Sequence, residues 1–242
     1  MKKHFKKIIT AIVSVTALCI GALYIYSADY YRADSTAVSA LQNSEAVSVE
    51  TADNMAVFRP ESIEAGFIFY PGGKVEYTAY APLMQHLAEN NIACVITKMP
   101  FNLAVMDINA ADKAAELLGN VDKLYIGGHS LGGSMASAFL DKSDIAFDGL
   151  ILLASYSTAD LTDNSIDVLS VYGSKDGVLN MESYTENIVN LPDDTTEIVI
   201  DGGNHAQFGC YGVQDGDGNA EISADEQLKT TAEAIIDFIK QQ

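Results

Sequence analysis

The chain has 242 residues, of which 48% are hydrophobic, and it contains 18 glycines but only 5 prolines. It is long enough to bury a core, and this composition excludes fibrous and intrinsically disordered proteins. The formal net charge of −19 at pH 7 gives a surface that repels phosphate groups, so we expect no nucleic-acid partner.

The first residues carry a membrane signal. Residues 1–7 include four lysines and form a basic segment that should stay on the cytoplasmic side. Residues 8–26 are nineteen residues without a charge or a proline, long enough as a helix to cross a hydrocarbon core. We therefore expect a single-pass membrane anchor with the remaining chain on the extracytoplasmic side. A cleaved signal sequence, which would leave a secreted protein, is the alternative, but the bulky Tyr26 in Tyr26-Ser27-Ala28 suits cleavage poorly.

A change of composition follows the apolar segment. Residues 27–46 are rich in alanine, serine and asparagine and are expected to form a polar stalk, which leads into a domain of residues 47–242. After Arg32 the chain has nine basic and thirty-two acidic residues, a net charge of −23. Because this charge repels anionic headgroups, we expect membrane attachment through the N-terminal helix.

Within residues 47–242, short apolar runs alternate with amphipathic patterns of helical period. The expected strands are residues 47–50, 56–58, 66–70, 93–97, 123–127, 149–154, 167–172 and 197–200, and the expected helices are residues 79–90, 107–118, 131–141, 181–190 and 224–240. Two of the strands are apolar throughout, as in parallel strands covered on both faces. We predict an α/β fold with a mostly parallel eight-stranded sheet, helices on both faces, an antiparallel edge formed by the first two strands, and no large cap domain.

Ser130 lies where an expected strand meets an expected helix, in Gly128-His129-Ser130-Leu131-Gly132. This G-x-S-x-G pattern is typical of a tight turn in which small neighbours let the backbone pass close to other segments and leave the serine exposed above the sheet. The turn also places Ser130 at a helix N-terminus, which favours developing negative charge. The pattern predicts a nucleophile.

A serine hydroxyl needs a base, normally a histidine oriented by a carboxylate. Of the four histidines, His4 precedes the membrane segment, His86 lies on an expected helix, and His129 adjoins the serine on an extended backbone that points it away. His205 remains, just past the last expected strand, where a loop can hang over Ser130.

The orienting acid is expected at a strand end, because catalytic groups in open parallel sheets gather at the carboxyl ends of the strands. Asp176 follows the strand at 167–172 directly. Asp160 and Asp163 compete with it but lie in a polar connection, and Asp167 precedes its strand, at the opposite edge. We therefore predict Asp176 as the third member.

In its order of Ser130, Asp176 and His205, the chain resembles the α/β-hydrolase superfamily over residues 47–240. It is similar to small lidless members of the dienelactone hydrolase and esterase type. Dienelactone hydrolases proper have a cysteine nucleophile where this chain has Ser130, so lactone hydrolysis is not implied. The resemblance implies a serine hydrolase, with a carboxylic ester as its substrate and no required cofactor.

The resemblance also implies an oxyanion hole of two backbone N–H groups. One belongs to Leu131, directly after the nucleophile. The other is expected in the loop after the third strand, at residues 70–75, where Gly73 is the candidate by position and Lys74 is its neighbouring alternative.

Residues 215–226 resemble the calcium loop of an EF-hand. The candidate ligands are Asp215, Asp217, Asn219, Glu221 and Glu226. The pattern departs from an EF-hand because Ala220 stands where a glycine is usual and no helical pattern leads into it. One interpretation is a structural calcium ion that braces the loop of His205. The other is a metal-free capping box, in which Ser223 and Glu226 begin the last helix.

We therefore expect an extracytoplasmic serine hydrolase that cleaves a small-molecule or lipid-like acyl ester through an acyl-enzyme. Two alternatives stay open, an acyltransferase acting on cell-envelope components and a non-catalytic binding module with the same fold. An apolar substrate wall is also expected from five residues on neighbouring loops, Tyr77, Tyr80, Met99, Phe101 and Phe208.

Overall fold

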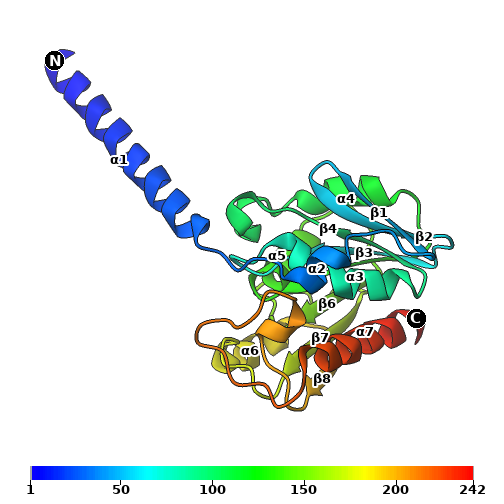
Figure 1. The fold of residues 1–242 in the computed structure, drawn as a ribbon. Coiled ribbons are helices and arrows are strands. Elements are labelled where there is room, and N and C mark those ends of the chain that lie inside the picture. Colours follow the sequence, from blue (N-terminus) through cyan, green and yellow to red (C-terminus); the bar gives the residue numbers. More distant parts are fainter. Residues whose placement is uncertain (1, 242) are drawn as a thin grey trace.

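The computed structural model describes residues 2–241 and, within its first helix, all side chains except those of residues 2–5, 11 and 19. A long N-terminal helix projects from a layered α/β unit (Figure 1). This arrangement separates an apolar helix from a domain that contains every residue with an expected chemical role.

Eight strands form one sheet in the order β1-β2-β4-β3-β5-β6-β7-β8. Their bounds are β1 Val47–Ala52, β2 Met55–Pro60, β3 Ala65–Tyr70, β4 Ile92–Ile96, β5 Leu124–His129, β6 Gly149–Leu153, β7 Asp167–Gly173 and β8 Thr196–Ile200. β1 pairs antiparallel with β2, and β2 antiparallel with β4, while all other neighbours are parallel. The predicted mostly parallel eight-stranded sheet is confirmed, including its antiparallel edge.

Helices cover both faces of this sheet, also as predicted, and no large cap is present in the described chain. Their bounds are α3 Ala81–Ala88, α4 Ala110–Leu118, α5 Leu131–Leu140, α6 Met181–Asn187 and α7 Ala224–Gln241. Short 3-10 turns complete the chain at η1 Tyr77–Tyr80, η2 Pro100–Asn102, η3 Ala104–Met106, η4 Ile188–Asn190 and η5 Ala206–Phe208.

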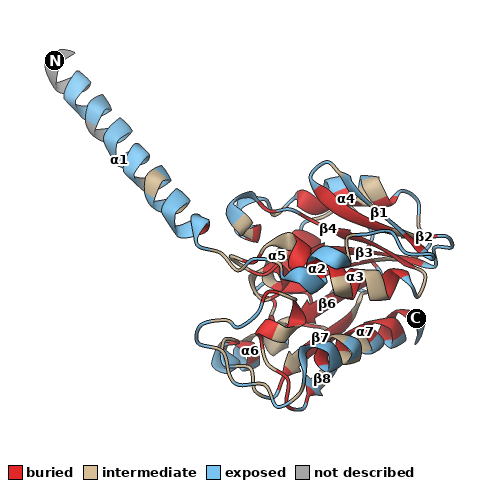
Figure 2. Cartoon of the chain, in the orientation of Figure 1, coloured by how far each residue is buried: buried red, intermediate tan, exposed pale blue. Residues whose placement is uncertain are grey.

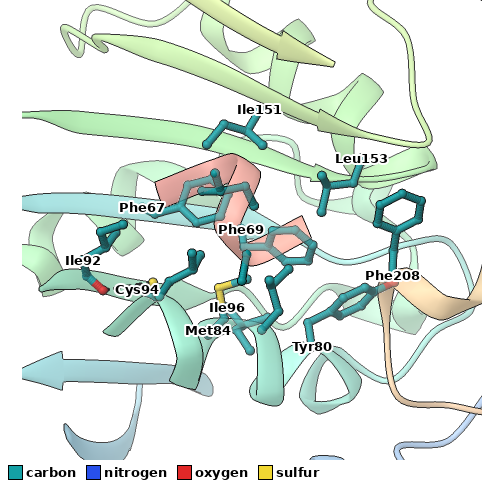
Figure 3. Close-up of a cluster of buried hydrophobic side chains, with 14 of the residues drawn as sticks. Phe67, Phe69, Tyr80, Met84, Ile92, Cys94, Ile96, Ile151, Leu153 and Phe208 are labelled. Atoms are coloured by element: carbon teal, nitrogen blue, oxygen red, sulfur yellow. Dashed lines mark hydrogen bonds between the residues drawn. The ribbon is translucent and has the colours of Figure 1, made fainter. Parts of the chain in front are cut away.

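The alternation of side chains along β3 divides the core into two layers. Phe67 and Phe69 pack with α3 and α7 on one face, and Ile68 and Tyr70 pack with α4 and α5 on the other. All four are fully buried, because successive residues of a strand point to opposite faces and both faces are covered. Figure 2 shows the buried strands between the helices, and Figure 3 shows the first layer around Phe67 and Phe69.

The N-terminal helix α1 (Lys2–Ala28) contains the predicted membrane segment. The most apolar 18-residue stretch within Lys6–Ala28 has a mean hydropathy of 2.4, and none of it is buried. By length and composition the helix can cross a membrane, and a signal sequence at an N-terminus has the same properties.

The segment expected to be a polar stalk packs against the domain from Tyr31 onward. The Tyr31 N–H donates to the Lys74 carbonyl (2.8 Å), and the Glu76 N–H donates to the Tyr31 carbonyl (2.8 Å). The short helix α2 (Ser35–Ser39) follows, with Asp34 as its N-cap and Ala37 fully buried. The difference from an extended stalk comes from these long-range contacts, which local composition does not reveal.

Candidate active site

Ser130 occupies a sharp turn between β5 and α5. Its φ of 53° and ψ of −124° are unfavourable for a residue with a side chain, and such strain persists only where the surroundings hold it. The Ser130 N–H donates to the Leu153 carbonyl (2.9 Å), and the Ser130 carbonyl accepts from Ser155 Oγ (2.7 Å) and the Ser134 N–H (3.3 Å). These hydrogen bonds use the main chain of Ser130, and its hydroxyl has no hydrogen-bond partner among the described residues.

The two glycines of the motif are required by close backbone contacts. A methyl group on Gly128 would lie 2.5 Å from the Tyr70 carbonyl oxygen, and one on Gly132 would overlap the carbonyl oxygens of Tyr70 and Pro71. Neither contact can be relieved by rotating a side chain, because both involve backbone atoms. The glycines therefore let β5 and α5 pass close to the end of β3 while Ser130 protrudes.

Asp176 and His205 form a buried hydrogen-bonded pair. Asp176 Oδ2 lies 2.9 Å from His205 Nδ1, and each side chain is 1% exposed. The other carboxylate oxygen, Oδ1, accepts from the Val178 N–H (2.8 Å) and the Leu179 N–H (2.7 Å). An ionised carboxylate only accepts hydrogen bonds, so Nδ1 carries the proton toward Asp176 and Nε2 of the neutral ring is left with its lone pair.

The His205 ring lies beside the turn that carries the serine. Its centroid is 4.4 Å from that of His129, the residue before Ser130. Val178 and Leu179, whose N–H groups hold Asp176, line the same cavity as Ser130. The three residues of the expected triad are thus brought to one end of the sheet.

The loop after β3 brings Gly73 next to the first residue of α5. A methyl group on Gly73 would lie 3.1 Å from a side-chain methyl of Leu131. The neighbouring N–H groups are already used: Gly72 donates to the Tyr80 hydroxyl (3.0 Å), and Lys74 donates to the Asn102 carbonyl (2.7 Å). This pattern favours Gly73 over Lys74 as the partner of Leu131.

Comparisons with known proteins identify the family of this chain. The model of the alpha/beta hydrolase family matches residues 66–229, which is more than half of the chain. The chain belongs to the alpha/beta hydrolase family. No curated protein matches its sequence.

Solved structures of esterases and a lipase share the fold of this family member. Carboxyl esterase 2 from the fungus Tuber melanosporum is 14% identical with a TM-score of 0.61, covering 88% of this chain and 91% of that chain. A thermostable esterase from Pseudomonas putida is 15% identical with a TM-score of 0.57, covering 85% and 86%. A soluble variant of monoglyceride lipase from Saccharomyces cerevisiae is 11% identical with a TM-score of 0.57, covering 83% and 96%.

Sequence reasoning missed a buried hydrogen bond near the site of this alpha/beta hydrolase, between the side chains of Tyr80 and His129. The Tyr80 hydroxyl accepts from the Gly72 N–H and lies 2.8 Å from Nδ1 of the fully buried His129. Tyr80 therefore donates to Nδ1, and the His129 proton resides on Nε2. Burial, and then the nearby His205 ring, lower the pKa of His129 well below its ordinary value. The His129 ring packs against the His205 ring, with the ring centroids 4.4 Å apart, and this burial keeps His129 neutral.

The five candidate calcium ligands do not form a metal site in this family member. Within the described residues, no group of three or more His, Cys, Asp or Glu side chains is placed to hold a metal ion. Glu221 forms an ion pair with Lys175 (2.8 Å), and both oxygens of Asp217 accept backbone N–H groups. Ser223 Oγ instead accepts from the Glu226 N–H (3.2 Å) at the start of α7, which fits the helix-cap interpretation.

A cavity of about 240 Å³ adjoins Ser130 and runs toward the ends of β6 and β7. It is lined by Ser130, Leu131, Ser134, Ala154, Ser155, Tyr156, Val178, Leu179 and Asn180. The five residues expected to form an apolar substrate wall do not line this cavity. Tyr77, Met99 and Phe101 line a different cavity, of about 450 Å³ and beside Tyr30, while Tyr80 and Phe208 are buried in the core.

Proposed function

We propose that this protein is a serine esterase that acts through a covalent acyl-enzyme. The observation that carries the proposal is the buried Asp176–His205 pair next to a strained serine turn, in which the Ser130 hydroxyl has no partner among the described residues. A weak nucleophile, an oriented base and free N–H donors at one point are the requirements for acyl transfer.

In the proposed mechanism Ser130 Oγ attacks the ester carbonyl and its proton passes to Nε2 of His205. The Asp176 carboxylate stabilises the imidazolium that forms, without taking the proton itself. The tetrahedral oxygen accepts from the N–H groups of Gly73 and Leu131. Each such donor contributes about 2.7 to 4 kcal/mol to the barrier reduction. His205 then protonates the leaving alcohol, and water attacks the acyl-enzyme by the same route in reverse.

The ester as substrate is supported by the structural neighbours, which are named as esterases and a lipase. At these low identities the likeness shows the fold alone, so the geometry of the site must add its own support for this substrate class. A serine activated by a neutral histidine, without a metal, suits an activated carbonyl such as an ester.

We also propose that α1 anchors the enzyme in a membrane with the domain on the extracytoplasmic side. The uncharged residues 8–26 of α1 and the four lysines that precede them support this orientation. Protease protection in intact and permeabilised cells tests it: the domain should be cleaved in both, and protection in intact cells would place it inside.

A fluorophosphonate probe tests the enzyme proposal. The wild-type protein should be labelled once, at Ser130, and Ser130→Ala should not be labelled, while Ser143→Ala, on the turn after α5, should react like the wild type. The unlabelled wild-type protein should also release free acid from a p-nitrophenyl ester, and labelling should abolish this activity. A wild-type protein that resists the probe, or labelling that survives Ser130→Ala, would contradict the proposal. Transfer of the acyl group to added glycerol, rather than release as acid, would instead indicate an acyltransferase.

A further inference from the structure

The carboxylate of Asp217 accepts four backbone N–H groups. Its Oδ1 accepts from Gly177 (3.0 Å), His205 (3.2 Å) and Gly218 (2.8 Å), and its Oδ2 accepts from Ala206 (2.8 Å). Hydrogen bonds to an ionised acceptor are about twice as strong as neutral ones. A single side chain thus satisfies donors from three separate stretches of chain.

Two of these stretches carry the proposed catalytic pair. Gly177 directly follows Asp176 in the loop after β7, and His205 with Ala206 lies in the loop after β8. The side-chain hydrogen bond between Asp176 and His205 joins the two loops at their tips. Asp217 joins the same two loops through their backbones. It accepts from the N–H group of His205 itself and from those of Gly177 and Ala206, which directly follow Asp176 and His205.

We propose that Asp217 is a positioning residue that sets the distance between Asp176 and His205. The carboxylate of Asp217 braces the His205 loop by accepting from backbone N–H groups of that loop. The acidic spacing of residues 215–226 had suggested a bound cation for the same role. Its partners are N–H donors, which attract an anion and repel a metal ion. This inference rests on the proposed esterase function, because it assigns a role within that triad.

The arrangement explains why an acid, rather than an amide, occupies this position. An asparagine offers one acceptor oxygen and one NH₂ group, and the NH₂ group cannot accept from a backbone N–H. In Asp217→Asn at least one of the four donors therefore loses its acceptor, and the loops separate to relieve the contact. A displacement of about 1 Å at a catalytic base costs on the order of 100-fold in rate.

The test compares the wild type, Asp217→Asn and Asp225→Asn in the full-length protein. Asp225 is exposed on the first turn of α7. It lines a cavity with Asn204 and Ala206, but its side chain accepts no hydrogen bond among the described residues, so its variant removes the same charge from the same segment without removing an acceptor from the loops. We expect Asp217→Asn to lower kcat and the rate of fluorophosphonate labelling roughly 10- to 100-fold, with KM within about twofold. Asp225→Asn should match the wild type in all three.

The outcomes separate this inference from the proposed function. A wild-type protein that is not labelled contradicts the esterase itself. A labelled wild type together with Asp217→Asn that reacts at the wild-type rate, even with a lower Tm, overturns only the role of Asp217 in positioning. Asp217→Glu, which keeps the charge on a longer side chain, should recover part of the labelling rate, and no recovery above Asp217→Asn would count against a charge-based bridge.

Hydrogen exchange keeps the inference testable should Asp217→Asn fail to fold. In wild-type protein, the amides of Gly177, His205 and Ala206 should exchange far more slowly than the amide of Gly216, although none of the four lies in an α-helix or a strand. Exchange of the first three at the rate of an unstructured peptide would show that Asp217 does not hold them, and would overturn the proposal.

Discussion

Asp176 Oδ2 lies 2.9 Å from His205 Nδ1, with both side chains withdrawn from solvent. The two N–H groups that hold Oδ1 belong to Val178 and Leu179, so the carboxylate has a partner on each oxygen. These partners fix the orientation of the buried Asp176 carboxylate, and they use both of its oxygens as acceptors. The histidine ring is consequently presented with one defined nitrogen free.

The first prediction concerns this carboxylate. Asp176→Asn replaces an acceptor by an amide that favours the wrong tautomer of His205, so kcat should fall by about 10⁴-fold with little change in KM. Asp160→Asn is the matched control, because Asp160 is exposed and contacts Thr162 alone among the described side chains. Ester hydrolysis measures both. Equal losses in the two variants, or near wild-type kcat in Asp176→Asn, would rule out the assigned acid.

A second prediction compares two buried tyrosines. Tyr80→Phe removes the hydroxyl that satisfies both the Gly72 N–H and His129 Nδ1, and each buried polar group left unpaired costs about 1 to 3 kcal/mol. The hydroxyl of Tyr125 has no partner among the described residues, so Tyr125→Phe should be neutral or slightly stabilising. In urea unfolding at pH 7.5, the free energy of unfolding of Tyr80→Phe should therefore be well below that of the wild type and that of Tyr125→Phe. The reverse ranking would contradict the hydrogen bonds of Tyr80.

A third prediction concerns the pH dependence of stability. The pKa of His129 lies well below its ordinary value of 6.5 in the folded protein. As the pH falls below 6.5, the unfolded chain takes up a proton at this ring while the folded protein does not. The free energy of unfolding should therefore decrease on acidification, by up to about 1.4 kcal/mol per pH unit from this group.

Replacing the ring should reduce that slope. His129→Gln is expected to lower stability at pH 7.5, but its stability should change less than that of the wild type between pH 6.5 and pH 5. Denaturant unfolding at several pH values measures both slopes. Parallel curves for the two proteins would show that His129 is charged in the folded state, against the prediction.

A fourth prediction concerns acyl length. The cavity beside Ser130, of about 240 Å³, is smaller than the roughly 300 to 1,000 Å³ typical of sites for drug-sized ligands. Among p-nitrophenyl esters, kcat/KM should be highest for acetate to butyrate and fall steeply for chains beyond about six carbons.

Leu179 lines this cavity and is nearly buried, so Leu179→Ala should move the optimum to longer acyl chains. Val189→Ala, at a site that is 70% exposed, should leave the preference unchanged. A long-chain preference in the wild type, or an optimum that does not move in Leu179→Ala, would mean that the acyl group binds elsewhere.

The strands and the serine turn are predictable from the sequence because both depend on residues that are close along the chain. The apolar runs predict all eight strands to within two residues at each end. The spacing of Gly128, Ser130 and Gly132 identifies the turn. The proposed catalytic acid and base follow from their places after β7 and β8, since the carboxyl ends of parallel strands meet at one edge.

Other parts of the site depend on contacts that spacing does not encode. The acidic residues at 215–226 have the spacing of a calcium loop, but the spacing does not reveal that Asp217 meets three N–H donors from two other loops. The Tyr80–His129 hydrogen bond likewise joins positions 49 residues apart. Both are decided by how the loops fold over one another.

Tyr31 already hydrogen-bonds to the domain, so only a short segment links the domain to α1. This segment limits how far from a bilayer the enzyme can work. Only Asp29 and Tyr30 separate the end of α1 at Ala28 from the Tyr31 hydrogen bonds, a tether of about 10 Å when extended. A free stalk of residues 27–46 would have spanned roughly 65 Å. With α1 inserted as we propose, the protein samples a thin layer at the membrane surface, and esters dissolved farther away must diffuse to it.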